Sequence, residues 1–149
     1  MDVEIVKINE DQEEKLTIHC HEITDEVREI VTFVKSRQGH LSGTFADAQY
    51  EIPVSDVYYL DSVDGKTFLY TKENVYETGY RLYELEELLK HKRFLRISKS
   101  TIVNLMKIDS IRPALNGRFS AFLRSGEELI ISRKYVKDFK EALKGGQTS

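Results

Sequence analysis

The chain begins with two short segments that are rich in aliphatic residues, and the second of them alternates between apolar and polar positions. The segments span residues 3–8 and 15–21. The apolar residues that alternate in the second segment are Leu16, Ile18 and Cys20. Because a period of two residues is typical of a strand with one buried face, the pattern predicts strands here and an inward-facing Cys20 side chain.

A helix is predicted next, because the spacing of apolar residues changes to three or four positions. The residues on this spacing are Val27, Ile30, Val31 and Val34. Thr24 stands where an N-cap is expected, acidic residues fill the first turn, and Gly39 follows the last turn. Residues 41–52 are predicted to be extended, and Pro53 ends them, so we expect a soft boundary near residue 54.

Beyond that boundary the pattern predicts a meander of short strands interrupted by one helix and closed by another. Strands are expected at residues 57–60, 67–70, 75–78, 108–112, 119–123 and 129–131. Strong turn signals lie at Asp64-Gly65, Asn116-Gly117 and Ser125-Gly126. Leucines at helical spacing predict a helix over residues 82–89, with its glutamates facing solvent, and a short helix follows residue 135.

The expected fold class is therefore mostly β with short helices (α+β). Residues 1–54 form a small strand-strand-helix module in this interpretation, residues 55–144 form the second domain, and residues 145–149 form a frayed tail. The single cysteine, the absence of a signal-peptide pattern and the absence of a long apolar run predict a cytoplasmic protein of bacterial type.

The charge distribution along the chain changes this picture more than the total does. The net charge is −3, but residues 1–54 carry 12 acidic and 5 basic residues, whereas residues 89–144 carry 14 basic and 5 acidic ones. Because charges farther apart than about 8 Å are screened at physiological salt, a polyanion responds to the local density. The second part of the chain is therefore a candidate nucleic-acid binder.

Three stretches combine turns, hydroxyl groups and basic side chains. They are residues 64–67, 93–101 and 132–135. Lysine and arginine neutralise phosphates, and serine and threonine hydroxyls bind phosphate oxygens. By charge pattern alone, a solvated strand with a mixed face explains residues 93–99 about as well.

Five sequence blocks resemble those of the LytTR family of DNA-binding domains, both in their residues and in their order. The blocks are DVYYLDS at 56–62, LYELEEL at 82–88, RFLRISKSTIVN at 93–104, IDSIR at 108–112 and ISRKYV at 131–136. The resemblance covers about residues 52–144. It implies an elongated domain of small β-sheets that reads direct repeats in promoter DNA through loops in successive major grooves and bends the duplex.

The resemblance also implies which side chains contact DNA. Base contacts fall on Lys66, Lys99 and Lys134. Phosphate contacts fall on Arg96, Ser98, Ser100 and Arg133. The three lysines depart from the histidine, asparagine or arginine of other members, so they bring charge to the bases without a directional or bidentate geometry.

Enzyme-like features have simpler interpretations. Gly65-Lys66-Thr67 lacks the glycine that a phosphate-binding loop needs five positions earlier, so a hairpin is favoured. His19 and His21 share a predicted strand face with few other metal ligands nearby. The sequence therefore predicts a non-enzymatic regulator without a cofactor or metal, and the rival interpretation is a non-DNA adaptor or a single-stranded RNA binder that uses its tyrosines.

Residues 1–54 are too short for a phospho-acceptor receiver domain. Their acidic composition suits homodimerisation, docking against the basic region, or binding of a regulatory partner. By analogy with standalone relatives of similar shape, that partner is expected to be a small integral membrane protein.

Overall fold

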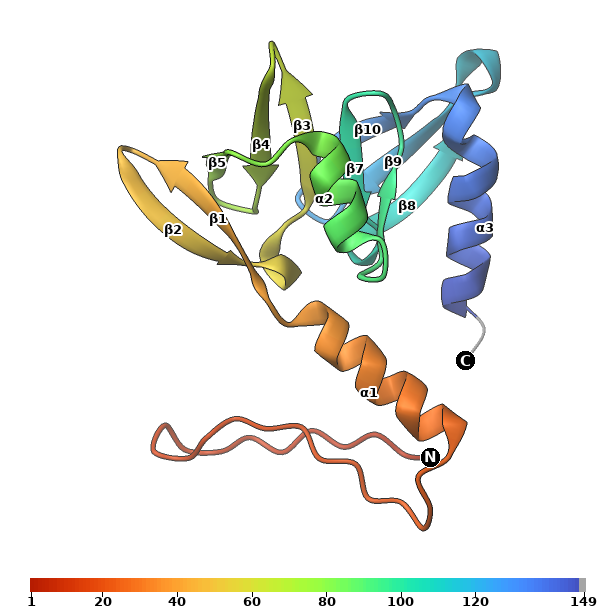
Figure 1. The fold of residues 1–149 in the computed structure, drawn as a ribbon. Helices are drawn as coiled ribbons and strands as arrows, with labels where there is room; N and C mark the ends of the chain where they lie inside the picture. Colours follow the sequence, from red (N-terminus) through yellow and green to blue (C-terminus); the bar gives the residue numbers. More distant parts are fainter. Residues whose placement is uncertain (148–149) are drawn as a thin grey trace.

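The computed structural model describes residues 1–147, which form two antiparallel sheets and three helices (Figure 1). The larger sheet has the strand order β2-β1-β5-β4-β3-β7-β6, and the smaller one has the order β10-β9-β8. The predicted class, mostly β with short helices, is confirmed.

The element bounds follow the chain in order. The larger sheet contains β1 (His40–Phe45), β2 (Ala48–Pro53), β3 (Tyr59–Val63), β4 (Lys66–Tyr70), β5 (Val75–Thr78), β6 (Phe94–Arg96) and β7 (Thr101–Asn104). The smaller sheet contains β8 (Ile108–Pro113), β9 (Phe119–Leu123) and β10 (Glu128–Ile131). The helices are α1 (Asp25–Arg37), α2 (Leu82–Leu89) and α3 (Val136–Gln147), with 3₁₀ turns η1 (Val54–Asp56), η2 (Leu105–Lys107), η3 (Leu115–Gly117) and η4 (Arg133–Tyr135).

The two faces of the larger sheet bury two separate hydrophobic cores. Neighbouring residues of β7 face opposite ways, because side chains alternate along a strand. Ile102 belongs to the core under α2, with Leu60, Leu69 and Leu85. Val103 belongs to the core shared with the smaller sheet and α3, where Phe139 is fully buried. The larger sheet is thus fixed on both sides, which holds its loops in place.

The predicted helix over residues 27–34 is α1, and its N-terminus is capped as the sequence suggests. The Thr24 hydroxyl accepts a hydrogen bond from the Val27 amide at 3.3 Å. Val27 is buried, and Val31 and Val34 are half-buried. The amphipathic pattern of α1 therefore corresponds to a face that is at least half-buried.

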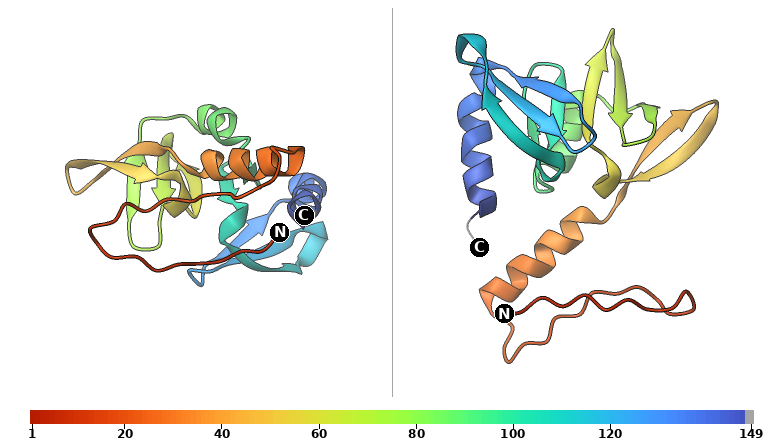
Figure 2. Two further views of the ribbon diagram at one scale, coloured as in Figure 1. Left: turned by 90° about the horizontal axis from the view of Figure 1, so that it is seen from below. Right: turned by 180° about the vertical axis from the view of Figure 1, so that it is seen from behind.

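The prediction of strands at residues 3–8 and 15–21 is wrong for this structure. Residues 1–24 form an extended arm that turns back near residues 9–12 and contains no strand, and Cys20 is exposed rather than buried. Figures 1 and 2 show this arm beyond α1, on the side away from the sheets. Alternation produces a strand only where an edge and an apolar face are available, and neither reaches the arm here.

The expected boundary near residue 54 falls inside the larger sheet. Residues predicted only as extended form the hairpin β1–β2, and Thr44 of β1 pairs with Glu77 of β5. The Thr78 hydroxyl adds a hydrogen bond to the Ser42 carbonyl at 2.8 Å. Gly43 permits the close approach, because a Cβ there would lie 2.7 Å from the Cβ of Tyr76.

Candidate nucleic-acid interface

The three basic stretches predicted from the sequence lie side by side along one edge of the molecule. They occupy the β3–β4 turn, the β6–β7 loop and η4, which all lie at the upper edge in Figure 1. Backbone hydrogen bonds join them, from the Ser62 amide to the Ser100 carbonyl at 2.8 Å and from the Ser132 amide to the Ile97 carbonyl at 2.9 Å. The β6–β7 loop is therefore the centre of one continuous surface.

The β3–β4 turn presents Lys66 at the start of β4. Asp64 and Gly65 adopt positive φ values of 52° and 78°, as a tight two-residue hairpin turn requires. The Lys66 ammonium lies 3.9 Å from a Glu77 carboxylate oxygen, and both side chains are more than half exposed. Such an exposed pair contributes only about 0–1 kcal/mol, so the lysine can exchange this partner for a phosphate or a base.

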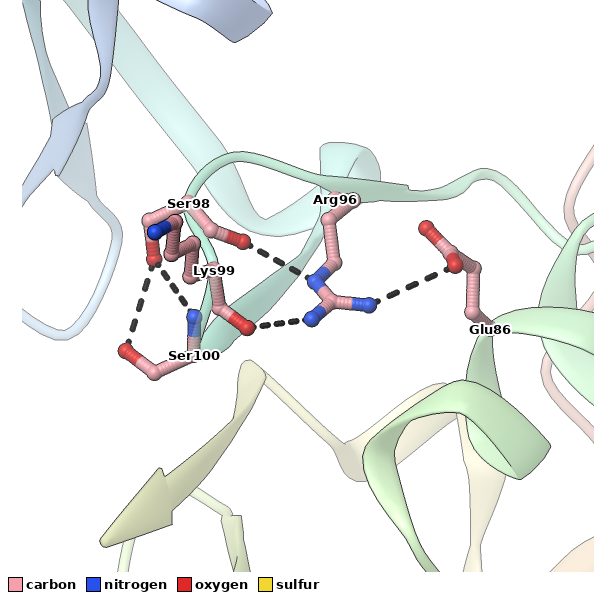
Figure 3. Close-up of polar contacts among 5 residues, drawn as sticks. All are labelled: Glu86, Arg96, Ser98, Lys99 and Ser100. Carbon is pink, nitrogen blue, oxygen red and sulfur yellow. Dashed lines mark hydrogen bonds and ion pairs between the residues drawn. The ribbon is translucent and has the colours of Figure 1, made fainter.

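The β6–β7 loop presents Lys99, whose side chain is exposed, whereas the Arg96 side chain is turned into the loop (Figure 3). The Arg96 Nε donates to the Ser98 carbonyl at 2.9 Å, and its Nη2 donates to the Lys99 carbonyl. Its Nη1 lies 3.4 Å from the Glu86 carboxylate on α2. Arg96 thus ties the loop that carries Lys99 to its own strand and to α2.

Ser98 and Ser100 belong to a short line of hydroxyl groups in the same loop (Figure 3). The Ser100 amide donates to the Ser98 hydroxyl at 3.2 Å, and the two hydroxyl oxygens are 3.5 Å apart. The line continues through Thr101, which donates to Asp61 at 3.1 Å. Both serines are half-buried, so their hydroxyls are oriented before any ligand arrives.

The segment η4 presents Arg133 and Lys134, and both side chains are exposed. The stem of Arg133 packs over Gly117, where an added Cβ would lie 2.9 Å from the arginine Cδ. Gly117 has a φ of 74°, which favours glycine. The predicted Asn116-Gly117 turn therefore also supports the basic residue beside it.

Arg81 is a candidate that the sequence interpretation missed. It precedes α2 and lines the same groove as Gly65, Arg96 and Lys99, between the β3–β4 turn and the β6–β7 loop. Its signal in the sequence is that it is the one basic residue between positions 73 and 87, among five glutamates. This groove gathers positive charge from two separate segments, the residue before α2 and the end of β6 with its loop.

Most of the tyrosines that could have stacked on single-stranded bases are buried or half-buried, whereas Tyr83 is 70% exposed. Tyr59 and Tyr70 stack on each other with ring centroids 4.1 Å apart, and the Tyr59 hydroxyl donates to Glu127 at 2.7 Å. Burial, and then the hydrogen bond to Glu127, raise the pKa of Tyr59 above its ordinary value. Tyr58 is also buried. These rings support the core rather than a base-stacking platform.

Other site types receive little support from the described residues. Among them, no group of three or more histidine, cysteine or carboxylate side chains is placed to hold a metal ion, and His19 and His21 lie on the exposed arm. The described helices include none with the length and apolar character to cross a bilayer. Gly65-Lys66-Thr67 belongs to a β-hairpin, not to a loop that leads into a helix.

Comparison with known proteins gives consistent matches. The family model described as the LytTr DNA-binding domain matches residues 47–144. Over 93 residues the chain is 31% identical to the sensory transduction protein LytT of Bacillus cereus, covering 62% of this chain but 38% of that protein. It is 32% identical over 133 residues to an uncharacterized HTH-type transcriptional regulator of Staphylococcus aureus, covering 88% and 90% of the two chains.

A solved structure supports the same grouping. A LytTr DNA-binding domain from Bacillus cereus superposes with a TM-score of 0.68 and 30% sequence identity. The match covers 71% of this chain and 97% of that one. At 30% identity the likeness extends to the sequence as well as to the fold.

Proposed function

The chain belongs to the LytTR family of DNA-binding domains, and from this premise we propose that it is a transcriptional regulator that binds double-stranded promoter DNA in a sequence-specific way. The observation that carries the proposal is the single edge on which the β3–β4 turn, the β6–β7 loop and η4 lie, joined by backbone hydrogen bonds. Each segment presents an exposed lysine, Lys66, Lys99 or Lys134.

In this proposal the three segments enter successive major grooves on one face of the duplex. The lysines reach base edges, while Arg133 and the hydroxyls of Ser98 and Ser100 bind phosphates. Direct repeats and bending of the duplex follow from the family resemblance. Phosphate neutralisation by the basic segment supplies most of the affinity, and loop geometry supplies the discrimination.

Fluorescence anisotropy tests this function directly. A labelled duplex that carries a selected direct repeat is compared with a scrambled duplex and a single-stranded RNA, each over a salt series. We expect the repeat duplex to bind more tightly by about 10³-fold at near-physiological salt, as specific DNA binders do. Equal binding of all three, with the same steep salt dependence, would show generic polyanion affinity and contradict the proposal.

We further propose that the arm formed by residues 1–24 binds a second copy of this chain. Glu4, Val6 and Ile8 share one concave face with Glu13, Lys15 and Thr17. Alternation then places Val3, Ile5 and Leu16 on the other face, where they are 92%, 94% and 66% exposed. The arm's charged residues lie mostly off this apolar face, so two copies can bring these faces together while the acidic groups stay in water.

The size of this surface fits a dimer contact. The exposed aliphatic side chains on this face, with Ile23, each offer on the order of 100 Å² and together supply about half of the roughly 800 Å² per partner of a standard interface. The polar residues of the arm and the half-buried face of α1 must supply the rest. A two-fold axis brings the same face from each chain, as in most soluble dimers. The expected integral membrane partner is the alternative occupant.

Sedimentation equilibrium of the full chain tests the dimer. We expect a dimer at micromolar concentration, and Ile5→Lys should weaken it by about 100-fold because a charge is buried in an apolar contact. Glu4→Lys is the matched control, since Glu4 lies on the other face. A monomeric wild type, or an Ile5→Lys variant that dimerises normally, would sink the proposal and leave the membrane protein as the candidate.

A further inference from the structure

Every carbonyl oxygen of the β6–β7 loop, residues 97–100, is held by a donor from outside the loop. The Ile97 carbonyl accepts from the Ser132 amide, and the Ser100 carbonyl accepts from the Ser62 amide. The two carbonyls between them, on Ser98 and Lys99, both accept from Arg96. One side chain therefore fixes the part of the loop that the backbone ladders do not reach.

The geometry of the guanidinium suits this task. Its planar fork lets Nε and Nη2 bind two successive carbonyls in a fixed geometry, whereas the ammonium group of a lysine has three donors but no rigid fork to hold them. The third edge faces Glu86 of α2 at 3.4 Å, and only 20% of the Arg96 side chain is exposed. With its donors turned inward, Arg96 has little left to offer a phosphate.

We propose that Arg96 is the positioning residue of the DNA interface, a clamp that fixes the loop backbone beneath Lys99, with Glu86 orienting the guanidinium. The inference rests on the proposed function. Lys99 is a point charge on a flexible stem, so it has no directional fork of its own with which to select a base. A backbone held at both carbonyls limits where the ammonium can go, and discrimination among bases then depends on Arg96.

The salt dependence of duplex binding separates a clamp from a phosphate contact. Each phosphate contact contributes about 0.9 to the slope of log K against log salt concentration. We expect Arg96→Lys to lower affinity for the repeat duplex about tenfold and to lower its preference over the scrambled duplex by the same factor, with the slope unchanged. The control Arg133→Ala removes an exposed cation and should reduce the slope by about one phosphate.

Because Arg96→Lys keeps the positive charge, the same variant can also contradict the clamp. If it binds with wild-type affinity and preference while Arg96→Ala shows a slope reduced by about 0.9, Arg96 acts as a charge and the clamp is overturned. Glu86→Gln retains the arginine and tests its orientation. We expect a loss of repeat preference in the same direction as for Arg96→Lys, but smaller.

Amide hydrogen exchange measures how firmly the loop backbone is held in the absence of DNA. In Arg96→Lys the Ser100 and Thr101 amides should exchange at least about tenfold faster, while amides of β9 keep wild-type protection, which shows that the domain remains folded. Unchanged exchange across residues 97–101 would overturn the clamp. If the wild-type chain fails to prefer the repeat duplex but the loop still loosens, the proposed function fails and the positioning role in the loop stands.

Discussion

Replacement of Asn104 by alanine is expected to lower the free energy of unfolding by about 3 kcal/mol, a large share of what a domain of this size holds. Asn104 is fully buried at the end of β7. Its Nδ2 donates to the Val57 carbonyl at 2.8 Å, and its Oδ1 accepts from the Met106 amide at 3.0 Å. Alanine leaves both backbone groups without these partners, at a cost of about 1–3 kcal/mol for each group that stays dry.

The same residue connects the cores to the interface. Its own amide donates to the Tyr58 carbonyl at 2.9 Å, so it joins β7 to the chain that leads into β3. Both strands lead directly to the loops that carry Lys66 and Lys99. Duplex binding should therefore also weaken, because the two strands that hold these loops lose a shared buried contact.

Urea denaturation followed by circular dichroism measures the change. Asn74→Ala is the matched control, because the Asn74 side chain is only part-buried and donates a longer hydrogen bond, 3.3 Å, to the Tyr76 hydroxyl. We expect that control to cost less than about 1 kcal/mol. A loss for Asn104→Ala no larger than that of the control would show that the buried amide is not the structural bridge described.

The periodicity of the sequence predicts buried faces well where the partner lies nearby in the chain. The leucines of α2 are one example, since the predicted helix over residues 82–89 coincides with the observed one. The β3–β4 hairpin is another, because Asp64-Gly65 is a turn that only a few sequence pairs favour. Both depend on local rules, which a single sequence contains.

Two predictions failed for the same physical reason. An alternating pattern of apolar residues shows that one face of a segment is apolar, but it does not show which other segment covers that face. The β1–β2 hairpin was predicted only as extended chain because its turn residues, Ala46 and Asp47, adopt φ values of 50° and 63° without a glycine or asparagine. Leu16 and Cys20 show the reverse case, because their pattern is that of a strand but they lie on an exposed arm. Tertiary contacts decided both outcomes.

The candidate site was predicted in part for a different reason. The pattern of turns and basic residues predicted the three stretches, which the structure brings onto one edge. The family resemblance then assigned contacts within them, but it could not distinguish an arginine that faces outward from one that faces inward. Arg96 and Arg133 look alike in the sequence, yet one is hydrogen-bonded to two loop carbonyls and the other is exposed. Charge patterning counts cations and says nothing about their direction.

The double variant Lys99→Ala with Lys134→Ala is expected to weaken binding of the repeat duplex by about 100-fold at fixed salt. Each exposed lysine removed costs about tenfold, in the range found for single DNA contacts. The two exposed side chains belong to different segments and act as separate contacts, so their effects should nearly add. Neither lysine supports a core, and the free energy of unfolding should stay within about 0.5 kcal/mol of the wild-type value.

The matched control is a second double variant with the same loss of charge, Lys72→Ala with Lys90→Ala. Lys72 follows β4 and lies at the opposite end of that strand from the β3–β4 turn, and Lys90 follows α2, where it pairs with Glu87. We expect less than about a threefold loss of affinity, because these charges lie far from the duplex and salt screens them. Equal losses in the two double variants would mean that net charge, and not the three-segment edge, carries the affinity.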